Sequence, residues 1–422
     1  MKKVLIIANL FHASPRIPGL AKYLPEFGWK PVILTPPLGE NPDSRFGPPN
    51  DFKEKNWVIE TFGYSSQHTW KRRGRLASKK LPDFVKAVLR FIYKHYLEVV
   101  NYPDEEKGWK TFALKSADDF LAIERADAII SSSSPVTAHI IARELKEKYR
   151  IPWVADLRDL WSQNHAYPHS FLRRFFDRML EKRTLKTADA LVTVSLPWAE
   201  RLMQLHNGKM AYEINNGFDP DDVNGELVKL TSKLTITYTG QIYIKGQDPA
   251  KFLLALKQLI DEGEIRREDV EVGFYGPEHE SLSEQIQKYD LSNIVKQHGI
   301  ISRKESIQRQ RESQVLLFFK WEKGEHGWHS GKIYEYLAAR RPILATGGEE
   351  DVVTELLNQT NAGVAAPTIE DIKSALRKLY VEYKLSGRIS YHGSMKEISK
   401  YSYLEMARKF AAVLDDLQKR GI

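Results

Sequence analysis

The chain has 422 residues, of which 42% are hydrophobic, and it carries a formal net charge of +8. This length exceeds one typical hydrophobic core and predicts two domains of about 200 residues each. The absence of cysteine excludes disulfides, thiolate metal sites and cysteine nucleophiles, and it fits a cytoplasmic protein. No transmembrane helix is expected, because the chain has no run of 18 apolar residues. The positive charge favours an anionic partner, which is a nucleotide, a nucleic acid or a membrane surface.

The first residues read as a buried strand, a polar loop and a helix. Residues 4–8 form an apolar run of the kind found in parallel sheets, and no cleavage site of a signal peptide follows it. The loop over residues 9–19 contains His12, Arg16 and Gly19 and lies at the carboxyl end of that strand, where α/β proteins bind ligands. His12 and Arg16 are candidates for acceptor or phosphate contacts, and the alternative is that they are solvated loop residues. The loop has no G-x-G-x-x-G fingerprint for a dinucleotide.

A strongly basic segment follows over residues 71–94. It contains nine Lys or Arg residues and one acidic residue, Asp83. Residues 82–100 have the periodicity of a helix, with an apolar face and a basic face. Such a helix can bind an anionic membrane surface. The alternative is a surface helix that packs its apolar face on the domain. Single-stranded nucleic acid is disfavoured, because no nucleic-acid-binding signature accompanies the basic residues.

Strands and helices alternate through the rest of the first half. Residues 126–131 predict a strand and residues 136–149 a helix, and the strand from 151 runs into Asp156, Arg158 and Asp159. Two acids and an arginine at the end of a strand are poor core residues, so they are candidate catalytic or acceptor groups. The alternative is an internal Arg–Asp pair. A charged amphipathic helix over residues 173–187, a strand and another helix complete the first domain.

The second half repeats the alternation. Its first strand ends in Gly240, its next strand ends in Gly276, and Lys245 follows the first of these glycines. Residues 402–405 read as a helix cap and open a last amphipathic helix. The predicted domains are 1–228, joined by the C-terminal helix 402–422, and 229–401.

Residues 327–346 carry the most specific pattern of the chain. His329, Ser330 and Gly331 have turn chemistry, and the helix periodicity begins at Lys332. The start of a helix offers backbone N–H groups and the positive end of the helix dipole, which suits a phosphate. Glu335 lies about one turn further on, where its carboxylate could accept hydrogen bonds from ribose hydroxyls. The alternative is an ordinary loop-to-helix junction.

The stretch from Glu335 to Leu344 resembles the donor-binding motif of the GT-B glycosyltransferases, in the large retaining family called family 4 or group 1. The resemblance implies two facing Rossmann-like α/β domains with the last helix crossing back to the first, and Glu335 as the ribose ligand. It further implies donor contacts from a set of loop residues: Gly240, Lys245, Gly276, His329, Ser330, Gly331 and Lys332. In the first domain, Asp156, Arg158 and Asp159 match the motif Asp-x-Arg-Asp-x-Trp near the active site, and Pro18-Gly19 matches the acceptor-side loop.

Two positions depart from the family pattern. Gly327 stands where the family often has a first glutamate that contacts the sugar, and Gln241 replaces a usual arginine. These departures support a second interpretation, a non-catalytic nucleotide-binding or assembly protein with the same fold. A GT-B epimerase or phosphorylase is a third.

The resemblance implies a retaining hexosyltransferase that moves a sugar from a nucleoside-diphosphate sugar to a hydroxyl acceptor, either a carbohydrate or a lipid-linked molecule. It implies neither a metal nor another cofactor. Cell-surface polysaccharide assembly, in the cytoplasm or peripherally on the inner face of the membrane, is the expected setting.

Overall fold

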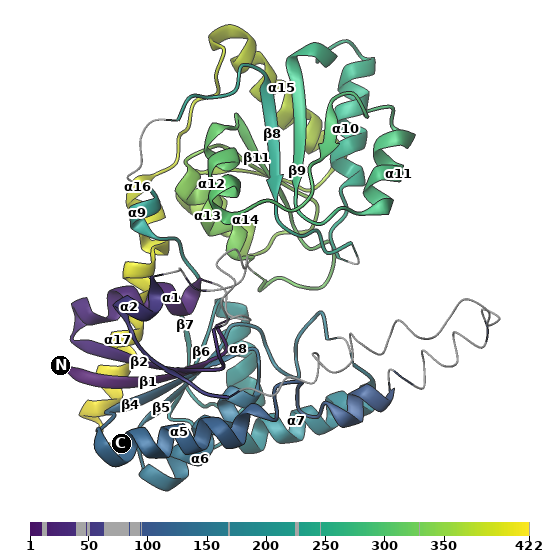
Figure 1. The fold of residues 1–422 in the computed structure, drawn as a ribbon. Coiled ribbons are helices and arrows are strands. Elements are labelled where there is room, and N and C mark those ends of the chain that lie inside the picture. The colour runs from purple at the N-terminus through teal and green to yellow at the C-terminus, as the bar shows by residue number, and fades with distance from the viewer. Residues whose placement is uncertain are drawn as a thin grey trace. The chain divides into compact units, whose positions relative to one another are not determined.

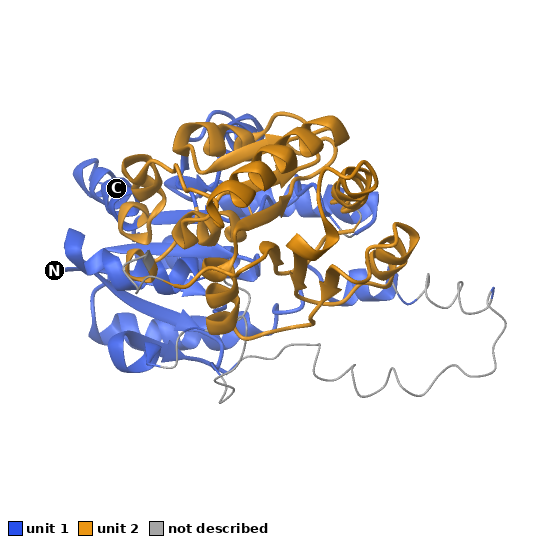
Figure 2. Ribbon diagram, turned by 90° about the horizontal axis from the view of Figure 1, so that it is seen from above, with its two compact units in different colours: residues 1–215, 407–422 blue, residues 216–406 orange. Residues whose placement is uncertain are grey.

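The chain divides into two compact units. Unit 1 comprises Met1–Asn215 and Ala407–Ile422, and unit 2 comprises Asn216–Met406, coloured blue and orange in Figure 2. The computed structural model describes residues 1–10, 15–38, 48, 51–62, 84, 93, 95–167, 169–223, 228–244, 246–328 and 330–421.

Unit 1 contains a parallel seven-stranded sheet with the order β3-β2-β1-β4-β5-β6-β7. Its strands are β1 (Lys2–Ala8), β2 (Trp29–Thr35), β3 (Trp57–Glu60), β4 (Ala128–Ser133), β5 (Trp153–Leu157), β6 (Ala190–Thr193) and β7 (Ala211–Glu213). The strand order reverses between β1 and β4, and open α/β sheets bind ligands at the carboxyl ends of the strands beside such a switch. The apolar residues 4–8 are fully buried in the centre of this sheet, as their sequence predicts.

The helices of unit 1 connect and cover these strands (Figure 1). They are α1 (Arg16–Tyr23), η1 (Leu24–Phe27), α2 (Phe52–Lys55), α5 (Trp109–Ile123), α6 (Thr137–Tyr149), α7 (Phe171–Leu185) and α8 (Leu196–Leu205). Helix α6 packs on β4 and β5 through its apolar side. The basic segment 71–94, except for residues 84 and 93, lies outside the described residues, so its prediction as an amphipathic helix stays a prediction.

Unit 2 contains a second parallel sheet, of six strands, with the order β10-β9-β8-β11-β12-β13. Its strands are β8 (Leu234–Thr239), β9 (Val270–Tyr275), β10 (Val295–Gln297), β11 (Val315–Phe319), β12 (Ile343–Thr346) and β13 (Gly363–Ala366). Its helices are α9 (Pro220–Val223), α10 (Ala250–Asp261), η2 (Arg267–Asp269), α11 (Glu280–Lys288), α12 (Arg303–Glu312), α13 (Gly331–Ala339), α14 (Val352–Thr360), α15 (Ile369–Ser386), α16 (Met395–Ile398) and η3 (Ser399–Tyr401). Here the strand order reverses between β8 and β11, which places the second switch beside the helix that carries Glu335.

The last helix, α17 (Tyr403–Lys419), starts in unit 2 and ends in unit 1. Ser402 caps it by accepting a hydrogen bond from the Glu405 amide at 3.2 Å. Near its far end, the Asp415 carboxylate accepts hydrogen bonds from Lys2 at 2.7 Å and from the Trp29 indole at 3.1 Å. The predicted return of the C-terminal helix to the first domain is therefore confirmed, as are the two parallel Rossmann-like sheets. None of the described helices is both long enough and apolar enough to cross a membrane.

Candidate functional site

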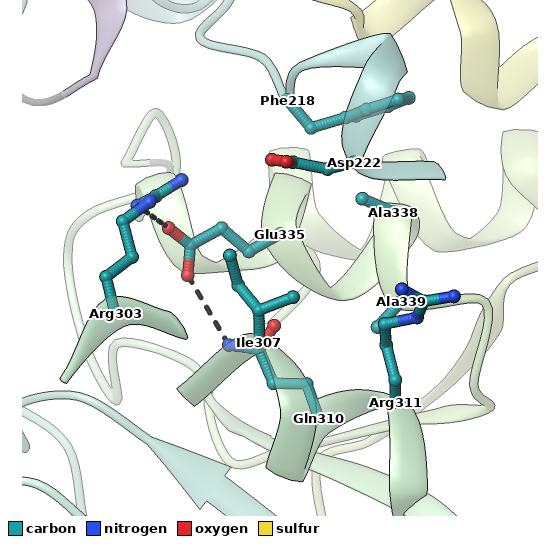
Figure 3. Close-up of a pocket in the computed structure, with 9 residues that line it drawn as sticks. All are labelled: Phe218, Asp222, Arg303, Ile307, Gln310, Arg311, Glu335, Ala338 and Ala339. Carbon is teal, nitrogen blue, oxygen red and sulfur yellow. Dashed lines mark hydrogen bonds and ion pairs between the residues drawn. The ribbon is translucent and has the colours of Figure 1, made fainter. Parts of the chain in front are cut away.

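A pocket of about 320 Å³ lies within unit 2, between helices α12 and α13 and the short helix α9 (Figure 3). Its lining is Phe218, Asp222, Arg303, Ile307, Gln310, Arg311, Glu335, Ala338 and Ala339. Figure 3 shows Arg303, Gln310 and Glu335 pointing toward one another. An Arg303 nitrogen donates to Glu335 Oε1 at 2.7 Å, and Gln310 Nε2 donates to Oε2 at 3.4 Å. The carboxylate that the sequence singles out is therefore held in a fixed orientation while 27% of its side chain stays exposed.

The pocket is tied to the end of the first strand of unit 2 by two polar contacts. Gln310 donates to Thr239 Oγ1 at 2.9 Å, and the Thr239 amide donates to the Tyr336 hydroxyl at 2.9 Å. Tyr336 is fully buried, and this burial raises its pKa, so the phenol stays protonated at neutral pH. Glu335 and Tyr336 thus fix helix α13 against the carboxyl end of β8.

The start of helix α13 has the geometry of a capped helix N-terminus. Ser330 is the N-cap residue, and its hydroxyl accepts a hydrogen bond from the Lys332 amide at 3.4 Å. Gly331 is the first helical residue. The Lys332 ammonium lies 3.6 Å from the centre of the Tyr238 ring, within the range of a cation–π contact. The start of a helix and a lysine therefore lie beside the end of β8, and the positive end of a helix dipole favours a bound anion.

Three neighbouring strand ends of unit 2 meet through glycine backbone. Gly240, after β8, has φ +100°, and its amide donates to Tyr275 O at 2.7 Å. The Gly276 amide donates to Gly299 O at 2.9 Å. A Cβ on Gly276 would lie 2.1 Å from Gly240 O, so only glycine fits there. The predicted Gly240, Gly276, Ser330, Gly331, Lys332 and Glu335 all come together around this edge of the second sheet, whereas Lys245 and His329 lie outside the described residues.

Sequence reasoning missed several residues at this edge. Arg303 and Gln310 orient Glu335, and the capping box at Ser302 signals only that a helix begins there. Three aromatic rings also lie close together, those of Trp321 and Trp328 after β11 and that of Tyr243 after β8. Trp321 lies 5.6 Å from Trp328 and 6.3 Å from Tyr243 between ring centroids. Their positions depend on contacts between segments that are distant in the sequence, so no local sequence pattern predicts them.

The end of β11 also carries a buried lysine that the sequence analysis passed over. Lys320 is 2% exposed, and its ammonium lies 3.2 Å from Asp351 Oδ1 and donates to Thr354 Oγ1 at 2.7 Å. Asp351 is the N-cap of α14. This network joins the end of β11 to the start of α14.

In unit 1, the predicted Asp156 and Arg16 form a buried ion pair. Arg16 NH2 donates to Asp156 Oδ1 at 2.9 Å, and Nε donates to Oδ2 at 3.1 Å. Ser132 donates to Oδ2 at 2.8 Å, so both carboxylate oxygens accept hydrogen bonds within unit 1. Arg16 also donates to the carbonyls of Ile214 and Asn215, each at 2.9 Å. The pair fastens the start of α1 to the end of β5 and to the chain after β7.

The other predicted residues of unit 1 lie around this pair. Arg158 donates from Nε to Ser133 O at 2.7 Å and from NH2 to Ser134 O at 3.1 Å, and burial lowers its pKa. Asp159 is exposed, and Gly19 is buried in α1. His12 lies outside the described residues.

Next to these groups lies a histidine that the sequence analysis did not single out. His139 of α6 is fully buried, and its Nδ1 lies 2.7 Å from Ser131 Oγ. Burial lowers the pKa of His139 to about 4, although the nearby Asp156 carboxylate acts in the opposite direction. The imidazole is therefore neutral at physiological pH.

No group of three or more His, Asp or Glu residues in the described part of the chain is arranged to hold a metal ion. In unit 2, the oriented Glu335 carboxylate lines the pocket and belongs to the helix whose capped start lies beside the end of β8.

Comparison with known proteins agrees with this description. Residues 13–211 match the family described as "Glycosyl transferase 4-like domain". No curated protein sequence matches the chain.

Three solved structures share the fold over nearly the whole chain. Sucrose-phosphate synthase from Thermosynechococcus elongatus is 11% identical with a TM-score of 0.63, and the match covers 100% of both chains. HepE from Anabaena, in complex with UDP and glucose, is 12% identical with a TM-score of 0.64, over 99% of this chain and 100% of that one. A glycosyltransferase from Rickettsia africae is 14% identical with a TM-score of 0.61, over 99% of both chains. The chain therefore has the GT-B fold, and its residues 13–211 match the glycosyl transferase 4-like domain.

Proposed function

We propose that the protein is a retaining glycosyltransferase that moves a sugar from a nucleoside-diphosphate sugar to a hydroxyl acceptor. The observation that carries this proposal is the convergence of the oriented Glu335 carboxylate, the start of α13 and the glycine-lined strand ends at one edge of unit 2. HepE, which has the same fold, was crystallised with UDP and with UDP-glucose, and this supports a uridine nucleotide as the first donor to test.

Each part of this edge has a role in the proposal. The Glu335 carboxylate accepts hydrogen bonds from the ribose hydroxyls, because Arg303 and Gln310 fix its direction. The diphosphate lies at the start of α13, near Ser330, Gly331 and Lys332, with Lys245 as a further contact. The helix dipole and the basic side chains stabilise the negative charge that develops on the leaving diphosphate.

The remaining parts of the proposal rest on the family resemblance. The donor phosphate deprotonates the acceptor hydroxyl as the new bond forms on the same face, so the sugar is transferred with retention and without a metal. The acceptor is a carbohydrate or a lipid-linked molecule of cell-surface polysaccharide assembly, and it is bound by unit 1 near Gly19, Arg158 and Asp159. The protein works in the cytoplasm, peripherally at the inner face of the membrane, and the basic segment 71–94 contributes to that attachment.

The donor site is tested by thermal unfolding with UDP, GDP, ADP and CMP and their sugar conjugates. A nucleotide present at 100 times its Kd adds about 2.7 kcal/mol to the free energy of unfolding. We expect one nucleoside diphosphate to raise the Tm of the wild type but not of Glu335→Ala. The matched control is Glu284→Ala, which removes an exposed carboxylate from α11 and keeps the full stabilisation.

A second assay separates catalysis from binding alone. The wild type is incubated with the stabilising sugar nucleotide and EDTA, and release of free sugar is followed by NMR, which also reports the anomer. Slow release with retention supports the proposal. Tight binding without any release, even with candidate acceptors, indicates the non-catalytic alternative that Gly327 and Gln241 suggest, and epimerised sugar indicates an epimerase.

A further inference from the structure

We propose that the outer face of helix α7 docks on an anionic lipid surface. The name "outer face" denotes the side chains of Phe171, Leu172, Phe175, Phe176 and Met179. This surface belongs to unit 1, and the proposal does not depend on the donor site or on the basic segment 71–94.

Helix α7 turns one arginine and both of its carboxylates inward. Arg173, Asp177 and Glu181, which are spaced four residues apart, are 6%, 2% and 0% exposed. Arg173 Nε donates to Asp177 at 3.1 Å, and NH2 donates to Pro103 O at 2.6 Å. Glu181 accepts a hydrogen bond from the Ser162 amide at 3.0 Å. Because unpairing such buried charges is costly, these contacts fix the rotation of the helix about its axis.

With that rotation fixed, the apolar side of α7 faces solvent. Phe171 is 86% exposed, Leu172 65%, Met179 56%, Phe175 53% and Phe176 49%. Positions 171, 175 and 179 lie one above another on a helix, as do 172 and 176, so the five side chains form one stripe. Large apolar side chains gathered on a surface in this way mark an interaction site rather than ordinary surface composition.

The exposed charged residues of α7 have a single sign. Arg174, Arg178, Lys182, Arg183 and Lys186 are all exposed, whereas both carboxylates of α7 are among its buried residues. An apolar stripe of Phe, Leu and Met on a helix whose exposed charged side chains are all Arg or Lys is complementary to a bilayer with anionic headgroups. A protein partner would need a matching acidic rim, and nothing in this composition selects one.

The segment before α7 adds to this surface. Ser170, the N-cap of α7, donates to Glu98 Oε2 at 2.6 Å, and the Tyr102 hydroxyl donates to Phe176 O at 3.2 Å. On the segment that these bonds hold beside α7, Val99 is 76% exposed and Tyr96 49%. Tyrosine at the edge of an apolar surface suits the interface between water and lipid.

Site-specific labelling can test the proposal, because the chain has no cysteine. Leu172→Cys and Met179→Cys are made in the full-length protein and coupled to an environment-sensitive fluorophore. The matched control is Ile123→Cys, an apolar side chain of unit 1 that is 86% exposed at the end of α5. The labelled proteins are mixed with vesicles of phosphatidylglycerol and phosphatidylcholine, with and without brominated acyl chains. We expect a blue shift and quenching at positions 172 and 179 but not at 123, and a much weaker response with phosphatidylcholine alone.

Sedimentation with the same vesicles gives the energetic contribution of the outer face. Each basic residue near an anionic surface contributes about 1 kcal/mol to the free energy of membrane binding. We therefore expect the double variant Arg174→Glu/Arg178→Glu to have a partition coefficient about 30-fold lower, or more. Phe175→Ser with Phe176→Ser lowers it on the order of tenfold or more, whereas Ile123→Ser leaves it unchanged. All these side chains are exposed, so the variants keep the Tm of the wild type.

Three results would overturn the proposal. One is sedimentation of the wild type without a spectral change at 172 and 179, which would place lipid contact elsewhere, including residues 71–94. Another is a blue shift without vesicles that grows with protein concentration, which would identify a second copy as the occupant. The last is a blue shift in dilute lipid-free protein, which would mean that another segment of the same chain covers α7.

Discussion

The acidic residue at the end of β5 illustrates how a candidate site residue can serve the fold. Asp156 is fully buried, and its two oxygens accept three hydrogen bonds, two from Arg16 and one from Ser132. The sequence places polar groups at this strand end, and both interpretations, a catalytic group and an internal Arg–Asp pair, follow from that placement. The partner of Asp156 could not be predicted, because Arg16 lies 140 residues away in the sequence and no local pattern around Arg16 indicates this pairing.

Removing that charge tests which interpretation holds. Asp156→Asn leaves the Arg16 guanidinium buried without a countercharge, so we expect the free energy of unfolding of unit 1 to fall by about 3–5 kcal/mol. Urea unfolding measures this loss. The control is Asp261→Asn, which breaks an exposed pair with Lys257 and costs less than about 1 kcal/mol. If Asp156→Asn retained full stability but lost transfer activity, the carboxylate would act in catalysis instead.

The buried histidine of α6 makes the stability of unit 1 depend on pH. The pKa of His139 falls to about 4 in the fold, against about 6.5 in the unfolded chain, so the unfolded chain binds the proton first as the pH drops. The folded state is therefore destabilised progressively from pH 6.5 down to 4, by about 3 kcal/mol in total. Below pH 4 this contribution no longer changes.

The contribution of this histidine is isolated by comparing two unfolding curves. We expect the difference in free energy of unfolding between wild type and His139→Gln to change across pH 4–6.5, with the wild type losing more on acidification. Replacement of the exposed His326 by Gln serves as the matched control. A constant difference between wild type and His139→Gln over that range would show that the imidazole titrates equally in both states.

At the scale of elements, two glycines at the edge of the second sheet where we propose that the donor binds differ in their surroundings. Gly276 follows β9 and would bring a Cβ to 2.1 Å from Gly240 O, whereas Gly331 has no atom within 4 Å of its Cβ position. Gly331 also has helical backbone at the start of α13. Alanine is favoured over glycine in a helix by up to about 1 kcal/mol.

Alanine substitutions at the two positions should therefore have opposite effects. Gly276→Ala forces the ends of β8 and β9 apart and is expected to lower the free energy of unfolding of unit 2 by more than about 2 kcal/mol. Gly331→Ala is expected to leave it unchanged or raise it by up to about 1 kcal/mol. Denaturant titration of the two variants decides this. Equal losses in both would show that steric space at Gly276 is not the cause.

Helix periodicity predicted where elements lie better than which way they face. The expected helix at 332–339 is found as Gly331–Ala339, and that expected at 173–187 is found as Phe171–Leu185. For α13 the apolar face is the buried one, so the pattern also gave its orientation. For α7 the pattern did not, because Arg173, Asp177 and Glu181 find partners from other segments and the apolar side is left outside.

At the scale of the whole molecule, the alternation of strands and helices predicted two parallel sheets, and motif spacing indicated the GT-B fold. The closure of unit 1 by α17 was expected only through the family resemblance, and the strand order was not predicted. They depend on pairings such as Lys2 with Asp415, which are 413 residues apart in sequence. Composition and local periodicity carry no information on partners at such distances.

The return of α17 to unit 1 has a consequence for how the protein is made. The strands of unit 1 leave the ribosome first, but the residues that complete their packing, Ala407–Ile422, are translated only after all of unit 2. At 5–20 residues per second, the intervening stretch of about 190 residues takes roughly 10–40 s to synthesise. During that interval the nascent first unit has exposed apolar surface where Phe410 and Leu414 will later be buried. The unit that is synthesised first is therefore the one that finishes folding last, and it is the half of the nascent chain with the greater need of a chaperone.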